Sequence, residues 1–188
     1  MTESEALQVF RDSGALLEGH FILRSGLRSR QFFQCALALQ SMPTVEKLGA
    51  ALAEKVLPLG AVTVIAPAMG GLVIGQEVAR QLRVRFIFVE KEEGQLVLRR
   101  GFKIAPGEKI LVVEDVVTKG GRAQETIDIV RAHGGRVLGV AMVVDRSNGA
   151  AHLGVPLFRV IKLNVETFEP DKLPPELAAI PPVKPGSK

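Results

Sequence analysis

Two adjacent carboxylates, Glu114 and Asp115, stand shortly before a group of residues that suits an anionic ligand. This group combines a hydroxyl, two basic side chains and paired glycines, in the order Thr118, Lys119, Gly120, Gly121 and Arg122. Glycines permit positive φ and let backbone N–H groups approach a ligand closely. A helix start behind them adds about 0.3–1 kcal/mol of attraction for an anion. The stretch predicts an anion cradle beside two acids; the alternative is an ordinary strand-to-helix turn with a carboxylate cap.

An apolar, β-branched run over residues 109–113 precedes the acids and predicts a strand buried on both faces of a parallel sheet. A helix is predicted after the glycines, because apolar and small residues recur at helical spacing at Ala123, Thr126, Ile127 and Val130. Consecutive carboxylates inside a strand would point to opposite faces, leaving one buried without a partner. We therefore expect the strand to end before Glu114. Both acids would then lie at the carboxyl edge of the sheet, where open α/β sheets bind ligands.

The rest of the chain alternates between strand-like and helix-like patterns, which predicts an α/β fold with a parallel sheet and helices on both faces. Further strands are expected at 61–66, 85–89, 137–144 and 157–163. Further helices are expected after a capping box at Thr2 and Glu5, over 43–57, and from a second glycine turn at 67–71 to residue 82. We expect a single domain over 1–188, with its core at about 43–165 and an extended tail at about 170–188 that contains six prolines.

Composition favours a soluble, cytoplasmic protein of one domain. Charged residues make up 23% and hydrophobic residues 47%, the chain has a single cysteine, Cys35, and no uncharged apolar run approaches about 18 residues. One cysteine excludes an intramolecular disulfide and favours a reducing compartment. The acidic start, Met-Thr-Glu-Ser-Glu, is unlike a secretory signal, and no membrane partner is expected. A net charge of +4 suits a polyanionic ligand.

The 109–122 stretch resembles the phosphoribosyl pyrophosphate motif of type I phosphoribosyltransferases, which is an apolar strand, two acids and a glycine-containing loop. The resemblance implies that Glu114 and Asp115 bind the ribose 2′- and 3′-hydroxyls. It also implies that the loop wraps the 5′-phosphate with residues Val116, Val117, Thr118, Lys119, Gly120, Gly121 and Arg122. Positions 119 and 122 are often small or hydroxyl residues in that family. Here their charges either tighten phosphate binding or point to solvent while only the backbone N–H groups act.

A predicted hairpin over residues 19–35, with its bend at Ser25 and Gly26, narrows the resemblance to orotate phosphoribosyltransferases. In that family a small N-terminal hood, here at about 15–40, caps the main sheet. The resemblance implies an orotate site formed by Arg24, Phe32, Phe33, Thr118 and Arg146, with Arg146 on the orotate carboxylate. The alternatives are that both phenylalanines belong to the core and that Arg146 is a surface cation.

Two further loops complete the resemblance. Met69, Gly70 and Gly71 occupy the place of the family's pyrophosphate loop, although Gly70 stands where orotate enzymes often carry a lysine. A turn at 90–95 and a returning strand at 96–102 match a mobile β-arm lid, whose catalytic base would be Lys91 acting in the partner subunit's site. Which of Lys91, Arg99 and Arg100 reaches that site stays open, and a solvated strand tip is the alternative reading of the charged loop.

The resemblance implies Mg²⁺-dependent transfer of phosphoribose from 5-phosphoribosyl 1-pyrophosphate (PRPP) to orotate, in a homodimer, forming orotidine 5′-monophosphate for UMP biosynthesis. No direct protein ligand for the metal is predicted. One alternative is a phosphoribosyltransferase for a purine or uracil. Another is a regulatory protein of the same fold that binds nucleic acid. Nucleic acid is not the expected partner, because Lys and Arg are scattered and Trp and Tyr are absent.

Overall fold

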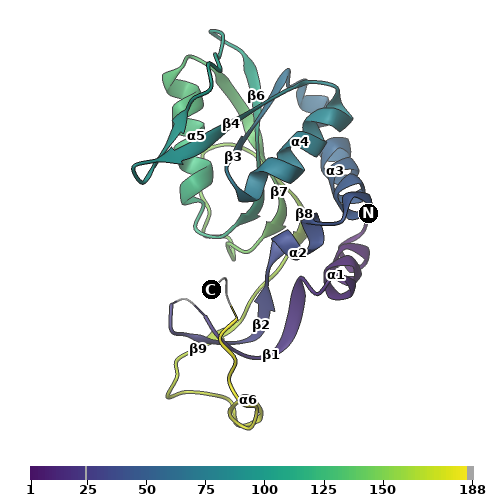
Figure 1. The fold of residues 1–188 in the computed structure, drawn as a ribbon, viewed down its shortest axis with the longest axis vertical. Coiled ribbons are helices and arrows are strands. Elements are labelled where there is room, and N and C mark those ends of the chain that lie inside the picture. The colour runs from purple at the N-terminus through teal and green to yellow at the C-terminus, as the bar shows by residue number, and fades with distance from the viewer. Residues whose placement is uncertain (24, 186–188) are drawn as a thin grey trace.

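The computed structural model describes residues 1–23 and 25–185, which form a large and a small sheet (Figure 1). The main sheet has the strand order β5-β4-β3-β6-β7-β8, and all neighbours are parallel except the antiparallel pair β4 and β5. Its strands are β3 (Thr63–Pro67), β4 (Arg85–Glu92), β5 (Gln95–Leu98), β6 (Lys109–Val117), β7 (Arg136–Asp145) and β8 (Leu157–Lys162).

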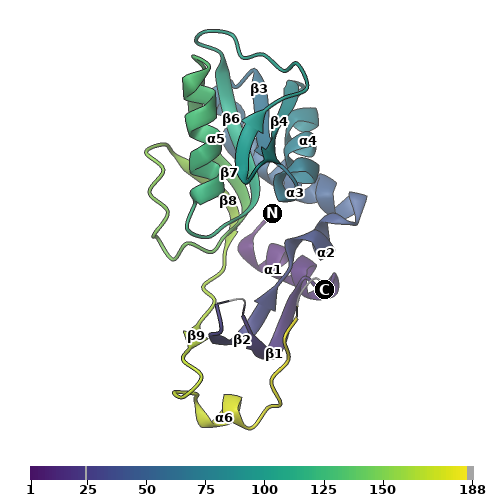
Figure 2. The same ribbon diagram turned by 60° about the vertical axis from the view of Figure 1, so that its left-hand side comes forward.

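Helices cover both faces of this sheet, which confirms the predicted α/β architecture (Figure 2). One face carries α3 (Met42–Val56), with the short 3-10 helix η1 (Leu57–Leu59) behind it, and α4 (Gly70–Leu82). The other face carries α5 (Gly121–Ala132). Strand β6 serves both layers, since Leu111 and Val113 pack toward α3 and α4 while Ile110 and Val112 pack toward α5.

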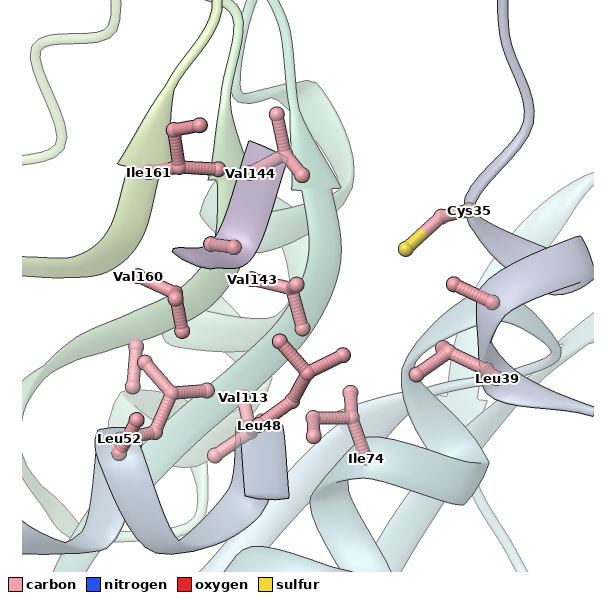
Figure 3. Close-up of a cluster of buried hydrophobic side chains, with 14 of the residues drawn as sticks. Cys35, Leu39, Leu48, Leu52, Ile74, Val113, Val143, Val144, Val160 and Ile161 are labelled. Carbon is pink, nitrogen blue, oxygen red and sulfur yellow. The ribbon is translucent and has the colours of Figure 1, made fainter. Parts of the chain in front are cut away.

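The core under α3 and α4 is built from aliphatic side chains of several elements. Figure 3 shows Leu48 and Leu52 of α3 and Ile74 of α4 next to valines of the central strands. Leu48, Leu52 and Ile74 are fully buried. This packing holds the first turn of α4 against β6, where the predicted acids lie.

The small sheet joins the two ends of the chain. It has the order β1-β2-β9, from β1 (Leu16–Ile22), β2 (Arg28–Phe33) and β9 (Thr167–Phe168). The predicted hairpin is therefore confirmed, and so is the capping box of α1 (Glu3–Asp12), where Thr2 and Glu5 exchange hydrogen bonds. A short helix, α2 (Cys35–Leu39), leads from β2 into the main domain. The sequence patterns did not predict α2.

The tail after β8 is more structured than expected. It contains α6 (Pro175–Ala178), and Leu177 is buried against the small sheet. Val183 exchanges two backbone hydrogen bonds with β1, donating to His20 O and accepting from Ile22 N, each at 2.8 Å. The strand expected at 157–163 is thus not the last one, and the tail belongs to the small sheet.

The arm beyond β4 also differs from expectation. Strand β4 continues to Glu92, so Glu90 and Lys91 lie in the strand opposite Val97 and Leu96, not in a turn. The returning strand is shorter than predicted and ends at Leu98. Among the described residues, no helix is long and apolar enough to cross a membrane.

Candidate active site

Two neighbouring cavities open at the carboxyl edge of the main sheet and share Gly70, Asp115 and Val116. The first, of about 450 Å³, is lined by Gly70, Glu114, Asp115, Val116, Val117, Thr118, Gly120, Gly121, Arg122, Ala123 and Glu125. The second, of about 580 Å³, is lined by Phe33, Gln34, Cys35, Ala36, Leu39, Gln40, Met69, Gly70, Val73, Asp115, Val116 and Arg146. Asp115 therefore stands at the junction of the two.

The expectation that β6 ends before the acids is wrong, because the strand runs through both of them to Val117. Glu114 is only 5% exposed. Burial, and next the neighbouring charge of Asp115, raise the pKa of Glu114 to about 9. The protonated carboxyl avoids the cost of a buried, unpaired charge, which is why a second acid is tolerated within the strand.

The first turn of α4 lies directly on these carboxylates. A Cβ atom added to Gly70 would stand 2.6 Å from Asp115 Oδ1, and one added to Gly71 would stand 2.9 Å from Val113 O. No side chain caps this helix, and its first turn contains no acid, so its N–H groups face the cavity edge without a side-chain acceptor. The preceding peptide bond, between Ala68 and Met69, is cis. The Met69 side chain is 80% exposed and lines the second cavity.

The loop at 118–122 forms the other wall of the first cavity. Gly120 has φ 80°, in the left-handed region that favours glycine, and it precedes α5 as the N-cap. This helix also lacks a side-chain cap and an acid in its first turn. Thr118, Gly121 and Arg122 line the cavity, whereas Lys119 is exposed outside it. Two helix N-termini thus flank the acidic pair, and each suits an anion.

The second cavity contains a cation that is largely removed from water. Arg146 follows β7, and its Nε is buried with no hydrogen-bond partner among the described residues. Burial lowers the pKa of Arg146. Its backbone is fixed by a 2.8 Å hydrogen bond from Arg146 N to Val117 O. On the other side of Arg146, Ser147 is held by Asp145, whose Oδ1 accepts hydrogen bonds from Ser147 N at 2.9 Å and from Ser147 Oγ at 2.6 Å. A partly buried guanidinium whose Nε is buried and unpaired suits an anion.

Aromatic and sulfur groups complete this cavity from the N-terminal side. Phe33 lines it and packs edge-on against Phe10, with ring centroids 5.1 Å apart. Phe32 is not among the lining residues and packs against Phe21, at 5.9 Å. Cys35 also lines the cavity, and burial, followed by the charge of Asp115, raises the pKa of its thiol well above the usual value.

Sequence reasoning missed the lining residues of α2, because a single helical turn offers no periodicity to detect. Arg24, predicted beside these groups, lies outside the described residues.

The predicted lid bases lie away from both cavities. Lys91 is exposed on β4 and lines neither cavity. Arg100 donates to Glu90, with Nη2 and Oε2 2.8 Å apart, and Arg99 pairs with Glu92 at 2.8 Å. The Arg100 guanidinium accordingly lowers the pKa of Glu90. Both arginines are therefore paired with glutamates of β4 in the same chain.

Two uncapped helix N-termini with an acidic pair between them are the arrangement that the resemblance to phosphoribosyltransferases leads us to expect. A family model described as "Phosphoribosyl transferase domain" matches residues 37–171. Over the whole chain, the protein is 50% identical to an orotate phosphoribosyltransferase of Rhizorhabdus wittichii, covering 97% of that relative. It is 48% identical to one of Desulforamulus reducens, covering 98% of it. The chain belongs to the orotate phosphoribosyltransferase family.

A solved structure agrees with this assignment. The crystal structure of orotate phosphoribosyltransferase from Aeropyrum pernix superposes with a TM-score of 0.68 at 28% sequence identity. The match covers 83% of this chain and 92% of that one. The similarity therefore extends beyond the residues matched by the family model.

Proposed function

We propose that this protein transfers the phosphoribosyl group of PRPP to orotate, which yields orotidine 5′-monophosphate and pyrophosphate in pyrimidine biosynthesis. Family membership supports the reaction. The observation that carries the choice of base is Arg146, a partly buried cation whose Nε has no hydrogen-bond partner among the described residues and which shares the second cavity with Asp115. Orotate is a pyrimidine with a carboxylate, and a planar guanidinium binds a carboxylate through two parallel hydrogen bonds. Uracil lacks this carboxylate and would leave the buried cation unpaired.

We assign PRPP to the first cavity, with one anionic group at each helix N-terminus. The loop at 118–121 and the start of α5 suit the 5′-phosphate. The N-terminus of α4 suits the pyrophosphate. The ribose between them would place its hydroxyls at Asp115 and Glu114. With PRPP in this orientation, the C1 atom of the ribose would lie near Asp115, where the two cavities meet.

The chemistry follows from this placement. The C1–O bond to pyrophosphate breaks with its electron pair leaving on the pyrophosphate. The N1 atom of orotate forms the new bond to C1 and gives up its proton, which the departing pyrophosphate can accept. No residue of the site needs to act as a covalent nucleophile. The carboxylate of Asp115 stabilises the cationic character that develops on the ribose. Glu114, held protonated by burial, positions Asp115 by accepting a hydrogen bond from Asp115 N at 3.2 Å.

The donor set of the site fits Mg²⁺ that binds together with the substrate. Mg²⁺ prefers oxygen ligands and is usually held by one or two carboxylates plus substrate phosphates. The site offers Asp115 and Glu114, and the described residues contain no cluster of three metal-ligating side chains. When bound, the ion disperses negative charge on the pyrophosphate. The protein itself would supply Asp115, the side chain at the junction of the two cavities.

A homodimer is the second part of the proposal. Lys91 is exposed on the hairpin that β4 and β5 form, and it lines neither of the two cavities at the sheet edge. Symmetric dimers are the commonest oligomers, and a two-fold axis would bring each arm to the other site. We also place the reaction in the cytoplasm, which suits the free thiol of Cys35.

The test measures pyrophosphate release from PRPP and Mg²⁺ with orotate, uracil, hypoxanthine or adenine in turn. Orotate alone is expected to react. Arg146→Gln should lower kcat/KM for orotate at least about 30-fold, because a buried charge pair is broken. Arg136→Gln is the matched control, since Arg136 is exposed at the opposite end of the same strand. Comparable wild-type rates with uracil would refute the assignment of orotate while leaving the family intact.

A further inference from the structure

A single side chain bridges the two loops that flank the acidic pair. Arg122, the second residue of α5, donates from Nη1 to Ala68 O at 3.2 Å. Ala68 belongs to the turn that leads into α4. Helix α4 packs on one face of the main sheet and α5 on the other. The Arg122 side chain therefore crosses the carboxyl edge of the sheet between the two helix N-termini, and it lines the first cavity together with Gly70.

The turn before α4 has no cation of its own. Residues 67–72 are Pro, Ala, Met, Gly, Gly and Leu, all uncharged. Position 70 does not have room for a longer side chain, because an added Cβ would stand 2.6–2.9 Å from all three atoms of the Asp115 carboxylate. An anion at this helix N-terminus would approach the side chain of Asp115, which lies directly beside Gly70. Besides a bound Mg²⁺, any positively charged side chain that offsets this repulsion must come from another element.

Arg122 is placed to supply that charge. Its guanidinium has five N–H donors, of which the contact to Ala68 O uses one. Its charge also acts on the acidic pair, since it partly opposes the rise in the pKa of Glu114 that burial and Asp115 cause. Lys119, the other basic residue of the loop, is exposed and does not line the cavity.

We propose that Arg122 is the cation of the pyrophosphate subsite, reaching across the sheet edge to a turn that has no charged side chain. This inference rests on the proposed function and adds a role for one residue. The resemblance places residues 118–122 around the 5′-phosphate, but the bond to Ala68 O assigns the Arg122 guanidinium to the opposite end of PRPP. As the C1–O bond breaks, its electron pair leaves with the pyrophosphate, and Arg122 stabilises the negative charge that accumulates there.

The test compares the binding of two partial ligands by calorimetry in the presence of Mg²⁺. Pyrophosphate reports the subsite at α4, and ribose 5-phosphate reports the 118–121 loop. Arg122→Gln should weaken pyrophosphate binding about 10- to 100-fold, which is the loss of one or two hydrogen bonds to a charged group. It should change ribose 5-phosphate binding by less than about threefold. Arg131→Gln, an exposed arginine in the last turn of the same helix, should change neither.

Every other pattern overturns the inference. If Arg122→Gln loses more affinity for ribose 5-phosphate than for pyrophosphate, Arg122 contacts the 5′-phosphate. If it loses equal affinity for both ligands, the charge of Arg122 attracts anions at either subsite without preference. No loss in either would leave its side chain without a ligand role. Should Arg122→Gln fail to fold, Arg122→Lys provides the same comparison: it keeps the charge, loses the planar fork, and is expected to weaken pyrophosphate binding severalfold, on the order of one hydrogen bond.

Turnover separates this inference from the proposed function. The binding measurements contain no orotate and so do not depend on turnover. If the wild type binds pyrophosphate and ribose 5-phosphate, and Arg122→Gln loses only the former, but the wild type does not convert orotate, then the proposed function alone is refuted. A wild-type protein that converts orotate, with unchanged pyrophosphate binding in Arg122→Gln, refutes the role of Arg122 alone.

Discussion

Replacing Glu114 by glutamine is expected to stabilise the protein, by an amount that grows with pH. The folded-state pKa of Glu114 is raised to about 9 from 4.5. As pH rises above 4.5, the unfolded chain releases this proton and the folded chain retains it, so wild-type stability falls across the window from about 4.5 to 9. Glutamine has no proton to release, and its carbonyl can still accept the hydrogen bond from Asp115 N. The sign of the effect is therefore a gain in stability for the variant.

The size of the gain follows from the width of the window. Each pH unit above 4.5 costs the wild type at most about 1.4 kcal/mol, which gives an upper limit of about 3 kcal/mol at pH 7 and less than about 1 kcal/mol at pH 5. For a protein of this length, about 3 kcal/mol corresponds to a rise in Tm of roughly 6–12 °C. Urea unfolding of both proteins at pH 5, 6, 7 and 8 measures the difference directly.

The matched control is Glu54→Gln, which replaces an exposed carboxylate of α3 and should shift stability little at any of these pH values. A Glu114→Gln variant that is less stable than wild type at pH 7 would refute the reasoning. So would a stability difference that is the same at pH 5 and pH 8, because the gain would then not come from the retained proton.

Three further predictions concern the acidic pair and the arm. Asp115→Asn should lower kcat on the order of 10²–10³-fold in a steady-state assay, with little change in Tm, because its carboxylate faces the cavity junction. Gly70→Ala should lower both activity and the free energy of unfolding, the latter by about 1–3 kcal/mol in urea, because its Cβ would meet Asp115 Oδ1 at 2.6 Å. Lys91→Ala and Asp115→Asn, unfolded and refolded together, should recover about a quarter of wild-type activity, since half of the dimers are mixed and each has one intact site.

Each of these predictions has a contradicting result. An Asp115→Asn protein that unfolds at a much lower temperature and keeps full activity would make this acid structural. Wild-type stability in Gly70→Ala would mean that the turn moves away from the carboxylate freely. No recovery in the mixed Lys91 and Asp115 sample would place Lys91 in its own subunit's site or exclude it from the reaction.

The parts of the structure that the sequence predicted well are those specified by neighbouring residues. The alternating strands and helices of the main sheet, the glycine turn before α4 and the loop at 118–122 are contiguous, so local spacing identifies them. The small sheet depends instead on residues far apart in the chain, since β2 pairs with β9 and His20 contacts Ile180. Local patterns hold no information on such pairings.

Two expectations at the site differ from the structure for a physical reason. The end of β6 was misplaced because a buried acid was counted as a buried charge, whereas Glu114 keeps its proton. Phe32 and Phe33 were both predicted beside the base, yet adjacent residues of a strand point to opposite faces, and only Phe33 lines the cavity. The alternation rule already allowed that choice from the sequence.

The position of β9 and Val183 in the small sheet sets an order of assembly during synthesis. All strands of the main sheet are made once residue 162 has emerged, whereas β1 and β2 gain their last partners only from residues 167–183. A ribosome adds residues one at a time, and regions complete in sequence can fold before the rest is made. The loops that suit phosphate groups are therefore complete on a nascent chain before the wall that carries Phe33 is locked in place. The side of the second cavity that carries Phe33 is thus the last part of the candidate site to gain all of its strand partners, after Arg146 and both loops have been made.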